Sequence, residues 1–216
     1  MIMFYGASGS PYVWRVWFAL EHKQASYEMK MLSFSAGDLR APSFVALNPR
    51  RKVPVVVDGD IVVYESAAIV EYLEDRFPSP APPLFPPDIG KRAIARRLIR
   101  EIDEYLARAL ESMLEEVLFK PPEEWIPTAI DRVRGNFVGE LARFENYAPQ
   151  ADFFIGEPGV VDHALYPLIA LALRLERRKS DLAIRPAIGA RLVAWMRRVE
   201  ALPYFAKTFP PHWKES

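Results

Sequence analysis

The arrangement of hydrophobic and polar positions changes part-way along the chain. Up to about residue 77, short β-branched runs alternate with short amphipathic segments, whereas beyond residue 88 the apolar residues recur at helical spacing. Between the two stretches lies FPSPAPPLFPPD, whose prolines can neither continue a helix nor pair in a central strand. The pattern therefore predicts a first domain at 1–78, a proline-rich linker at 79–87 and a second domain at 88–216.

The first domain is predicted to mix strands and helices in the order βαβ and then ββα. The runs IMFY and YEMKML suit strands, and a helix from Pro11 to Lys23 separates them. The apolar stripe of this helix consists of Val13, Val16, Trp17 and Leu20. The run VPVVVDGDIVVYES then indicates two strands around the turn Asp58-Gly59-Asp60, and a last helix follows from about Ser66 to Arg76.

The second domain is predicted to be all helical. Its apolar residues form four stripes at helical spacing, which suits four or more helices packed on one another. Representative positions of these stripes are Leu106, Phe137, Leu168 and Trp195. The fold class that follows is an α+β N-terminal domain followed by an all-α helical bundle domain.

Composition removes several classes of function. The 216 residues contain no cysteine, which excludes a disulfide framework, a thiolate metal site and a cysteine nucleophile, so any thiol chemistry must use sulfur that a ligand brings. The histidines His22, His163 and His212 lack ligand-like spacing, so no metal site is predicted. Lys and Arg total 28, as do Asp and Glu, a balance that argues against nucleic acid or an anionic membrane surface as a partner. No membrane span or signal peptide is visible, and the expected location is the cytoplasm.

The first candidate for chemistry is Ser10, in the stretch GASGSPYVWRV. Ser10 is a good helix N-cap and Pro11 an ideal first helical residue, so a purely structural role explains both. A helix N-terminus also carries unpaired N–H groups and a partial positive charge. A thiolate brought by a ligand would be stabilised there, and the Ser10 hydroxyl could donate a further hydrogen bond to it.

Two further segments suit the ends of a small polar ligand. Val53 and Pro54 precede a strand, where a cis peptide bond would let the backbone of Val53 pair with an extended peptide. Ser66 stands at a strand-to-helix boundary, where its hydroxyl and N–H could cap the helix or bind a ligand carboxylate. Glu65 beside it could pair with a ligand ammonium. For Glu65 and Ser66, helix capping is the alternative explanation.

Together these segments resemble a known family. SPYVWRVWFAL, FVALNPRRKVPVVVDG and VYESAAIVEYLEDRFP look like the thioredoxin-like domain of the cytosolic glutathione S-transferases, and a helical second domain after a proline-rich linker matches the plan of that family. The serine at the start of the first helix resembles the serine-type classes, such as tau and zeta. The resemblance implies reduced glutathione as co-substrate, with no covalently bound cofactor, and a homodimer.

The resemblance also implies roles for individual residues. Ser10 would hydrogen-bond the glutathione thiolate, with Ser8 as a competitor for this role. The backbone of Val53 would hold the cysteinyl residue of glutathione, with Pro54 as a structural residue. The remaining contacts would be made by Glu65 and Ser66 at the γ-glutamyl group and by Arg40 and Lys52 at the glycine carboxylate.

In the second domain the resemblance is carried by fewer residues. GEPGVVDHALYP matches a helix start of the family in which Gly159 replaces the usual Ser or Thr cap, and Asp162 is expected to be a structural capping residue. Asp103 would reach the γ-glutamyl end of glutathione across a dimer interface. The candidate residues of a pocket for the acceptor lie in predicted helices and in the tail. Those in helices are Tyr12, Tyr105, Arg108 and Met113, for which packing in the core is the alternative, and those in the tail are Phe209 or Trp213.

The function implied is transfer of the glutathione thiolate to a small, hydrophobic electrophile. A glutathione-dependent isomerase, dehalogenase or peroxidase would use the same site, although SPYV differs from the serine-and-cysteine run of the zeta isomerases. The alternative from another class is a non-catalytic glutathione-binding or interaction module. Retention of the whole set of polar residues weighs against it, because a scaffold needs none of them.

Overall fold

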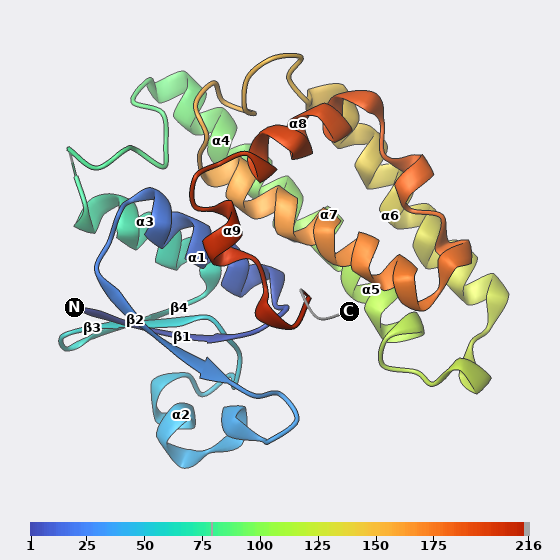
Figure 1. Cartoon of the computed structure of the whole chain (residues 1–216), viewed down its shortest axis with the longest axis horizontal. Helices are drawn as coiled ribbons and strands as arrows, with labels where there is room; N and C mark the ends of the chain where they lie inside the picture. The colour runs from blue at the N-terminus through green and yellow to red at the C-terminus, as the bar shows by residue number, and fades with distance from the viewer. Residues whose placement is uncertain (79, 214–216) are drawn as a thin grey trace. The chain divides into compact units, whose positions relative to one another are not determined.

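The computed structural model describes residues 1–78 and 80–213, which form two compact units (Figure 1). The first unit comprises Met1–Pro87 together with the segment that begins at Leu202, and the second comprises Asp88–Ala201. The boundary at residue 88 coincides with the predicted end of the linker. The segment after residue 201 is grouped with the first unit, whereas the sequence pattern placed it in the second domain.

The first unit is built on a four-stranded mixed sheet in the order β2-β1-β3-β4. Strand β1 pairs in parallel with β2 and antiparallel with β3, which in turn pairs antiparallel with β4. In chain order the elements are β1 (Ile2–Ala7), α1 (Pro11–His22), β2 (Tyr27–Leu32), η1 (Asp38–Arg40), α2 (Pro42–Leu47), β3 (Val55–Asp58), β4 (Ile61–Tyr64) and α3 (Ser66–Arg76). The predicted βαβ and ββα order is therefore confirmed.

The two sides of this sheet are covered by different helices. Figure 1 shows α1 and α3 together on one face and the short α2 on the other. Phe4 of β1 and Val55 and Val56 of β3 are fully buried, as expected for inner strands with both faces covered. This packing holds the start of α1 and the start of α3 in one unit, and both were candidate parts of a site.

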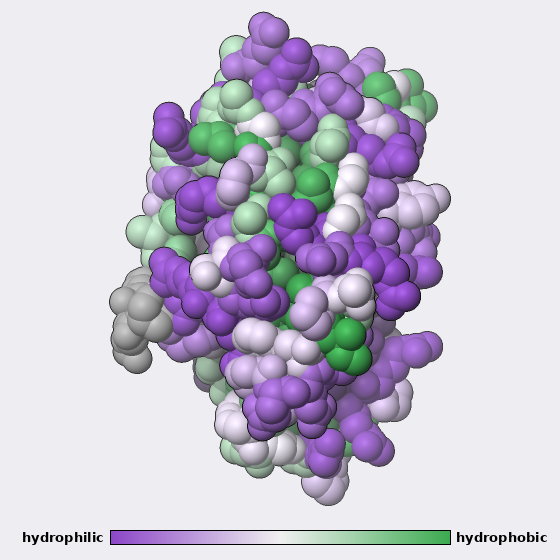
Figure 2. Space-filling view, turned by 90° about the vertical axis from the view of Figure 1, so that its right-hand side faces the viewer, coloured by the Kyte–Doolittle hydropathy of each residue, from purple (hydrophilic) through white to green (hydrophobic). Residues whose placement is uncertain are grey.

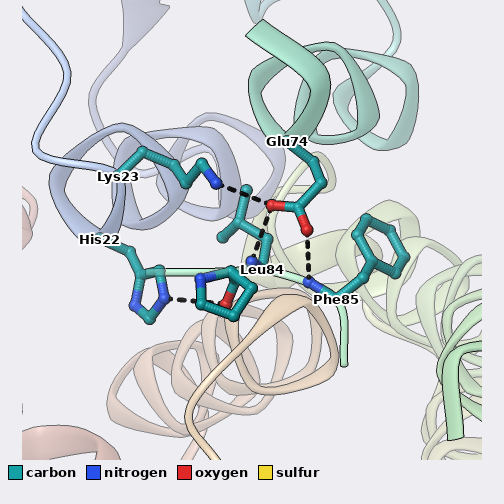
Figure 3. Close-up of polar contacts among 6 residues, drawn as sticks. His22, Lys23, Glu74, Leu84 and Phe85 are labelled. Carbon is teal, nitrogen blue, oxygen red and sulfur yellow. Dashed lines mark hydrogen bonds and ion pairs between the residues drawn. The ribbon is translucent and has the colours of Figure 1, made fainter. Parts of the chain in front are cut away.

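The proline-rich linker contacts α1 and α3 through polar groups (Figure 3). The carboxylate of Glu74 in α3 accepts hydrogen bonds from the backbone N–H groups of Leu84, at 2.9 Å, and Phe85, at 3.4 Å. It also pairs with Lys23 Nζ at 2.8 Å, and His22 Nε2 lies 3.2 Å from the carbonyl oxygen of Pro83. The linker has few N–H groups of its own, and these contacts tie it to the end of α1.

The segment after residue 201 lies along α1 in Figure 1. It contains α9 (Phe205–Thr208) and the turn η6 (Pro211–Trp213). The Trp14 ring of α1 contacts the rings of Phe205, Phe209 and Trp213, with centroid separations of 5.5 to 6.0 Å. Trp14 Nε1 also donates to Thr208 Oγ1 at 3.1 Å. Burial of several aromatic faces explains why this segment belongs to the first unit.

The second unit is helical, as predicted. Its elements are α4 (Ile89–Glu101), the π-helical turn η2 (Ile102–Leu106), α5 (Ala107–Val117), η3 (Pro122–Glu124), α6 (Pro127–Tyr147), α7 (Val160–Arg178), η4 (Ser180–Leu182), η5 (Arg185–Ala187) and α8 (Ala190–Glu200). The core contains Leu106, Phe137, Leu168 and Trp195, one from each of the four predicted stripes. The π-helical turn joins α4 to α5, so that one helical stretch carries both Asp103 and Tyr105.

The surface in Figure 2 is mixed in hydropathy, with hydrophobic residues in small groups between hydrophilic ones. Within residues 1–78 and 80–213, the structure contains no helix with both the length and the apolar character that a membrane crossing requires. Nor do the residues described include a group of three or more His, Asp or Glu side chains placed to hold a metal ion.

Candidate functional site

Ser10 is the N-cap of α1. Its hydroxyl oxygen accepts a hydrogen bond from the backbone N–H of Val13 at 3.4 Å, and Pro11 occupies the first helical position. This bond is longer than the usual range for N–H···O contacts, so the cap is a weak one. As an acceptor in the cap, the hydroxyl keeps its own hydrogen for donation. The capping role and the proposed chemical role of Ser10 are therefore compatible.

Ser8 is engaged by a residue far along the chain. Its Oγ lies 2.5 Å from Nδ1 of His212. Between Ser8 and the cap, Gly9 adopts φ of +86°, a conformation that favours glycine. The turn before α1 thus presents two serine hydroxyls with different partners, and His212 is a neighbour that the sequence pattern did not identify.

The loop before β3 is shaped by Asn48, a residue that sequence analysis did not single out as functional. Its Nδ2 donates to the carbonyl oxygen of Lys52 at 2.7 Å, and its Oδ1 accepts from the N–H of Arg50 at 3.0 Å. The Val53–Pro54 bond that follows is cis, as the sequence predicted. Backbone pairing between β3 and β1 begins at Val55, so Val53 precedes the ladder. In the sequence, the role of Asn48 could have been inferred from its place in the NPRRKVP motif.

The start of α3 differs from the prediction in one respect. Glu65, with φ of +71°, is the N-cap, and Ser66 is the first residue of the helix. The Ser66 hydroxyl accepts a hydrogen bond from Arg15 Nη1 at 3.2 Å and does not cap the helix. The N–H of Ser66 lies in the first turn, where backbone N–H groups have no partner within the helix. A positive φ at a non-glycine residue is unfavourable and is most often kept where it orients functional groups.

Arg15 is a second residue that sequence analysis missed. Its side chain is 2 % exposed, and its guanidinium lies 5.9 Å above the ring of Tyr12 while it donates to Ser66. A buried cation is costly unless it is hydrogen-bonded. Arg15 therefore links the start of α1 to the start of α3 from inside the unit. In the sequence, Arg15 could have been noticed as a charged residue between the apolar residues of VWRVW.

The two expected carboxylate-binding cations are exposed. Arg40 ends η1, and Lys52 directly precedes Val53. Glu65 is exposed as well, whereas Ser66 is buried with 7 % of its surface accessible. The first unit thus combines Ser10, Val53, Glu65 and Ser66 on one sheet and its flanking helices. Their contacts with a ligand stay predictions.

The other candidate residues lie mostly in the second unit. Tyr105 is 61 % exposed, and Arg108 is exposed and paired with Glu104 at 2.5 Å. Met113 is fully buried, which favours core packing over a place in an acceptor pocket. Asp103 is half-buried in η2, and its contact across a dimer stays a prediction.

Asp162 lies at the third position of α7. Its carboxylate accepts hydrogen bonds from the N–H of Gly159 at 3.0 Å, from the N–H of Phe154 at 3.2 Å and from Trp195 Nε1 at 2.7 Å. Burial raises the pKa of this carboxyl to about 6, although these donors oppose the rise. The three donors give Asp162 a structural role in joining the loop before α7 to α8.

Comparison with known proteins gives a consistent result. The family model described as the N-terminal domain of glutathione S-transferase matches residues 9–76. Glutathione S-transferase A of Pleuronectes platessa is 28% identical over 214 residues, which cover 97% of this chain and 91% of that protein. A probable maleylacetoacetate isomerase of Vibrio cholerae is 29% identical over 219 residues, which cover 97% and 95%.

Solved structures agree with these sequence relatives. The crystal structure of a glutathione S-transferase from the Antarctic clam Laternula elliptica superposes with a TM-score of 0.81 at 30% sequence identity. The match covers 100% of this chain and 94% of the clam protein, so it includes both units.

Proposed function

Since the chain belongs to the glutathione S-transferase family, we propose that it is an enzyme that transfers the thiolate of reduced glutathione to a small, hydrophobic electrophile. The observation that carries the proposal is the state of Ser10 at the start of α1. Its hydroxyl caps the helix only as an acceptor, so its hydrogen can be donated to an anionic sulfur placed against the helix N-terminus.

The stabilisation of the glutathione thiolate that this function requires is modest. Lowering the pKa of the glutathione thiol by two units takes about 2.7 kcal/mol of preferential stabilisation of the thiolate. A helix N-terminus contributes ~0.3–1 kcal/mol, and a hydrogen bond to a charged group ~1.5–3 kcal/mol. Together these two interactions supply the stabilisation. The sulfur then forms a bond to the electrophilic carbon. Either a leaving group departs with its electron pair, or the electron pair of a multiple bond moves onto the neighbouring atom to give a carbanion that takes up a proton.

The rest of glutathione would be held by backbone and charged groups of the same unit. The backbone of Val53, before the cis bond, suits pairing with the cysteinyl residue as a short added strand. The N–H of Ser66 suits the γ-glutamyl carboxylate, and Glu65 its ammonium group. Arg40 and Lys52 suit the glycine carboxylate, for which the planar guanidinium of Arg40 offers a bidentate fit.

Replacement of Ser10 tests the proposed function. The variant Ser10→Ala should lower kcat/KM for a chlorodinitrobenzene-type electrophile on the order of ten- to a hundredfold, because it loses one hydrogen bond to a charged group. Glutathione affinity, measured by calorimetry, should change little. Ser112→Ala is the matched control, since this exposed serine of α5 donates only to the carbonyl oxygen of Arg108 in the structure. Wild-type kinetics for Ser10→Ala would refute the role of Ser10.

A second candidate function is supported by the Vibrio cholerae relative. An isomerase adds the thiolate to a double bond, allows rotation and eliminates glutathione again, so glutathione is not consumed. Assays of maleylacetoacetate isomerisation and of chlorodinitrobenzene conjugation by one preparation would separate the two functions. Glutathione binding without turnover in either assay would favour the non-catalytic module.

A homodimer in the cytoplasm is part of the same proposal. It is supported by membership of the family, and the proposed reach of Asp103 to glutathione requires the second subunit.

A further inference from the structure

The segment after residue 201 reaches back to the residues that precede Ser10. Contacts of Trp14 with Phe205, Phe209 and Trp213 align it along α1. Its last described turn, η6, lies where α1 begins, because His212 bonds to Ser8 and Trp213 packs on Trp14. An inference about this turn rests on the proposed function, since it concerns the sulfur that Ser10 would bind.

The imidazole of His212 is placed by two independent contacts. Its Nδ1 lies 2.5 Å from Ser8 Oγ. A Cβ atom added at Gly9 would lie 2.7 Å from His212 Cε1 and 3.2 Å from Nε2, so the Cε1–Nε2 edge rests directly on the backbone of Gly9. Gly9 is the residue immediately before Ser10. The Nε2 atom of His212 therefore lies against the residue that precedes Ser10.

We propose that His212, oriented by Ser8, accepts the proton of the glutathione thiol. The Nδ1–H group donates to Ser8 Oγ, which leaves the lone pair on Nε2. The S–H bond of glutathione breaks, its proton forms an N–H bond at Nε2, and the electron pair stays on sulfur. The thiolate that results accepts the hydrogen bond of Ser10, and the imidazolium gives its proton to the leaving group, to the carbanion of an addition product or to water.

The surroundings of His212 suit this task. The imidazole is exposed and lies against Ser8, Gly9 and Trp213. The imidazole of histidine is the most frequent general base in enzymes. A base that is held by a third polar group follows the usual arrangement of an activated nucleophile. Ser8 thus has a defined part as the positioning residue for His212.

A purely structural latch is the competing explanation, because His212 also fastens the segment to α1. Two variants separate the explanations. His212→Gln keeps a side-chain N–H for Ser8 but accepts no proton near neutral pH. His22→Gln is the matched control, since His22 also contacts the segment, through Tyr204 Oη at 3.1 Å, but lies at the opposite end of α1.

The test is the pH profile of kcat/KM for chlorodinitrobenzene conjugation, together with the ultraviolet absorbance of the thiolate in bound glutathione. For His212→Gln we expect kcat/KM near neutral pH to fall at least tenfold. The thiolate should also form at higher pH than in the wild type, with glutathione affinity unchanged. Ser8→Ala should shift both curves in the same direction by a smaller amount, and His22→Gln should leave both in place.

The possible failures are distinguishable. Wild-type profiles for both His212→Gln and Ser8→Ala would overturn the role of His212 while leaving the transferase in place. Equal losses in His212→Gln and His22→Gln, without a shift of the thiolate titration, would show that His212 is only a latch. If the wild-type protein neither binds glutathione nor turns over, the proposed function fails and this inference fails with it. Should His212→Gln not fold, Ser8→Ala decides the question by the same two measurements.

Discussion

At the scale of single residues, buried polar side chains have the most consequence. Asp162, Arg15 and Asn48 are each at most 2 % exposed. Each is held by named partners, as buried polar groups must be. Asp162 was expected to be a capping residue because GEPGVVDHALYP resembles a helix start of the family. Arg15 and Asn48 were not identified, because their partners are set by the fold of the whole unit.

Asp162 has a predictable effect on stability. Its folded pKa of about 6 lies above its ordinary value of 3.8, so the folded protein holds this proton more tightly than the unfolded chain does. The protonated carboxyl makes its complete contribution to the free energy of unfolding below about pH 4, and this contribution is lost as pH rises through about 6. Asp162→Asn carries no charge and should therefore be less destabilised at pH 7 than at pH 4, relative to the wild type.

Denaturant unfolding of both proteins across this pH range measures the difference. Asp162→Ala is the stronger perturbation, because it leaves three buried donors unpaired at a cost of roughly 1–3 kcal/mol each. A difference between the wild type and Asp162→Asn that does not vary with pH would contradict the raised pKa.

At the scale of elements, the end of α1 holds two irregular segments. His22 Nε2 lies 3.2 Å from Pro83 O in the linker, and Nδ1 lies 3.1 Å from Tyr204 Oη in the segment after residue 201. Since a carbonyl oxygen only accepts, Nε2 is the donor, and in the neutral ring Nδ1 accepts from Tyr204. One side chain therefore fastens both segments to the same helix, as Figure 3 shows for the linker.

The attachment of these segments should depend on pH. Burial lowers the pKa of His22 from its ordinary value of 6.5, so the unfolded chain takes up this proton first as pH falls. The stability contributed by the neutral ring is full above about pH 6.5 and declines below it. His22→Gln should flatten this part of the stability curve between about pH 5 and 7, as monitored by thermal unfolding. A curve with unchanged slope would show that His22 does not titrate differently in the folded state.

The limits of sequence patterns are clearest in these elements. The helix from Ser66 to Arg76 and the strand YEMKML have the predicted bounds, because periodicity and turn signals are local. The cap of α3 did not follow its pattern, since Arg15 binds the Ser66 hydroxyl from another helix. The segment after residue 201 was assigned to the helical domain, because its short aromatic pattern does not indicate which surface it covers.

At the scale of the whole molecule, the assembly state is open to direct measurement. The family predicts a homodimer, and the edge strand β4 exposes Ile61 and Val62, an arrangement that proteins usually cover or charge. Light scattering should give a mass near twice the chain mass of 24.7 kDa. A monomer at working concentration would contradict the homodimer and, with it, the proposed reach of Asp103 across an interface.

The sequence by itself determined the kind of molecule: an α+β unit, a proline-rich connection and a helical unit. Its resemblance to a known family also predicted a glutathione site at Ser10, Val53, Glu65 and Ser66. These features follow from local periodicity, from turn chemistry and from motifs whose spacing is short. Only the tertiary structure decided that Arg15 supports Ser66 and that His212 lies beside Gly9. Those pairs join residues 51 and about 200 positions apart, and burial of aromatic surface along α1, not any local preference, brings the second pair together.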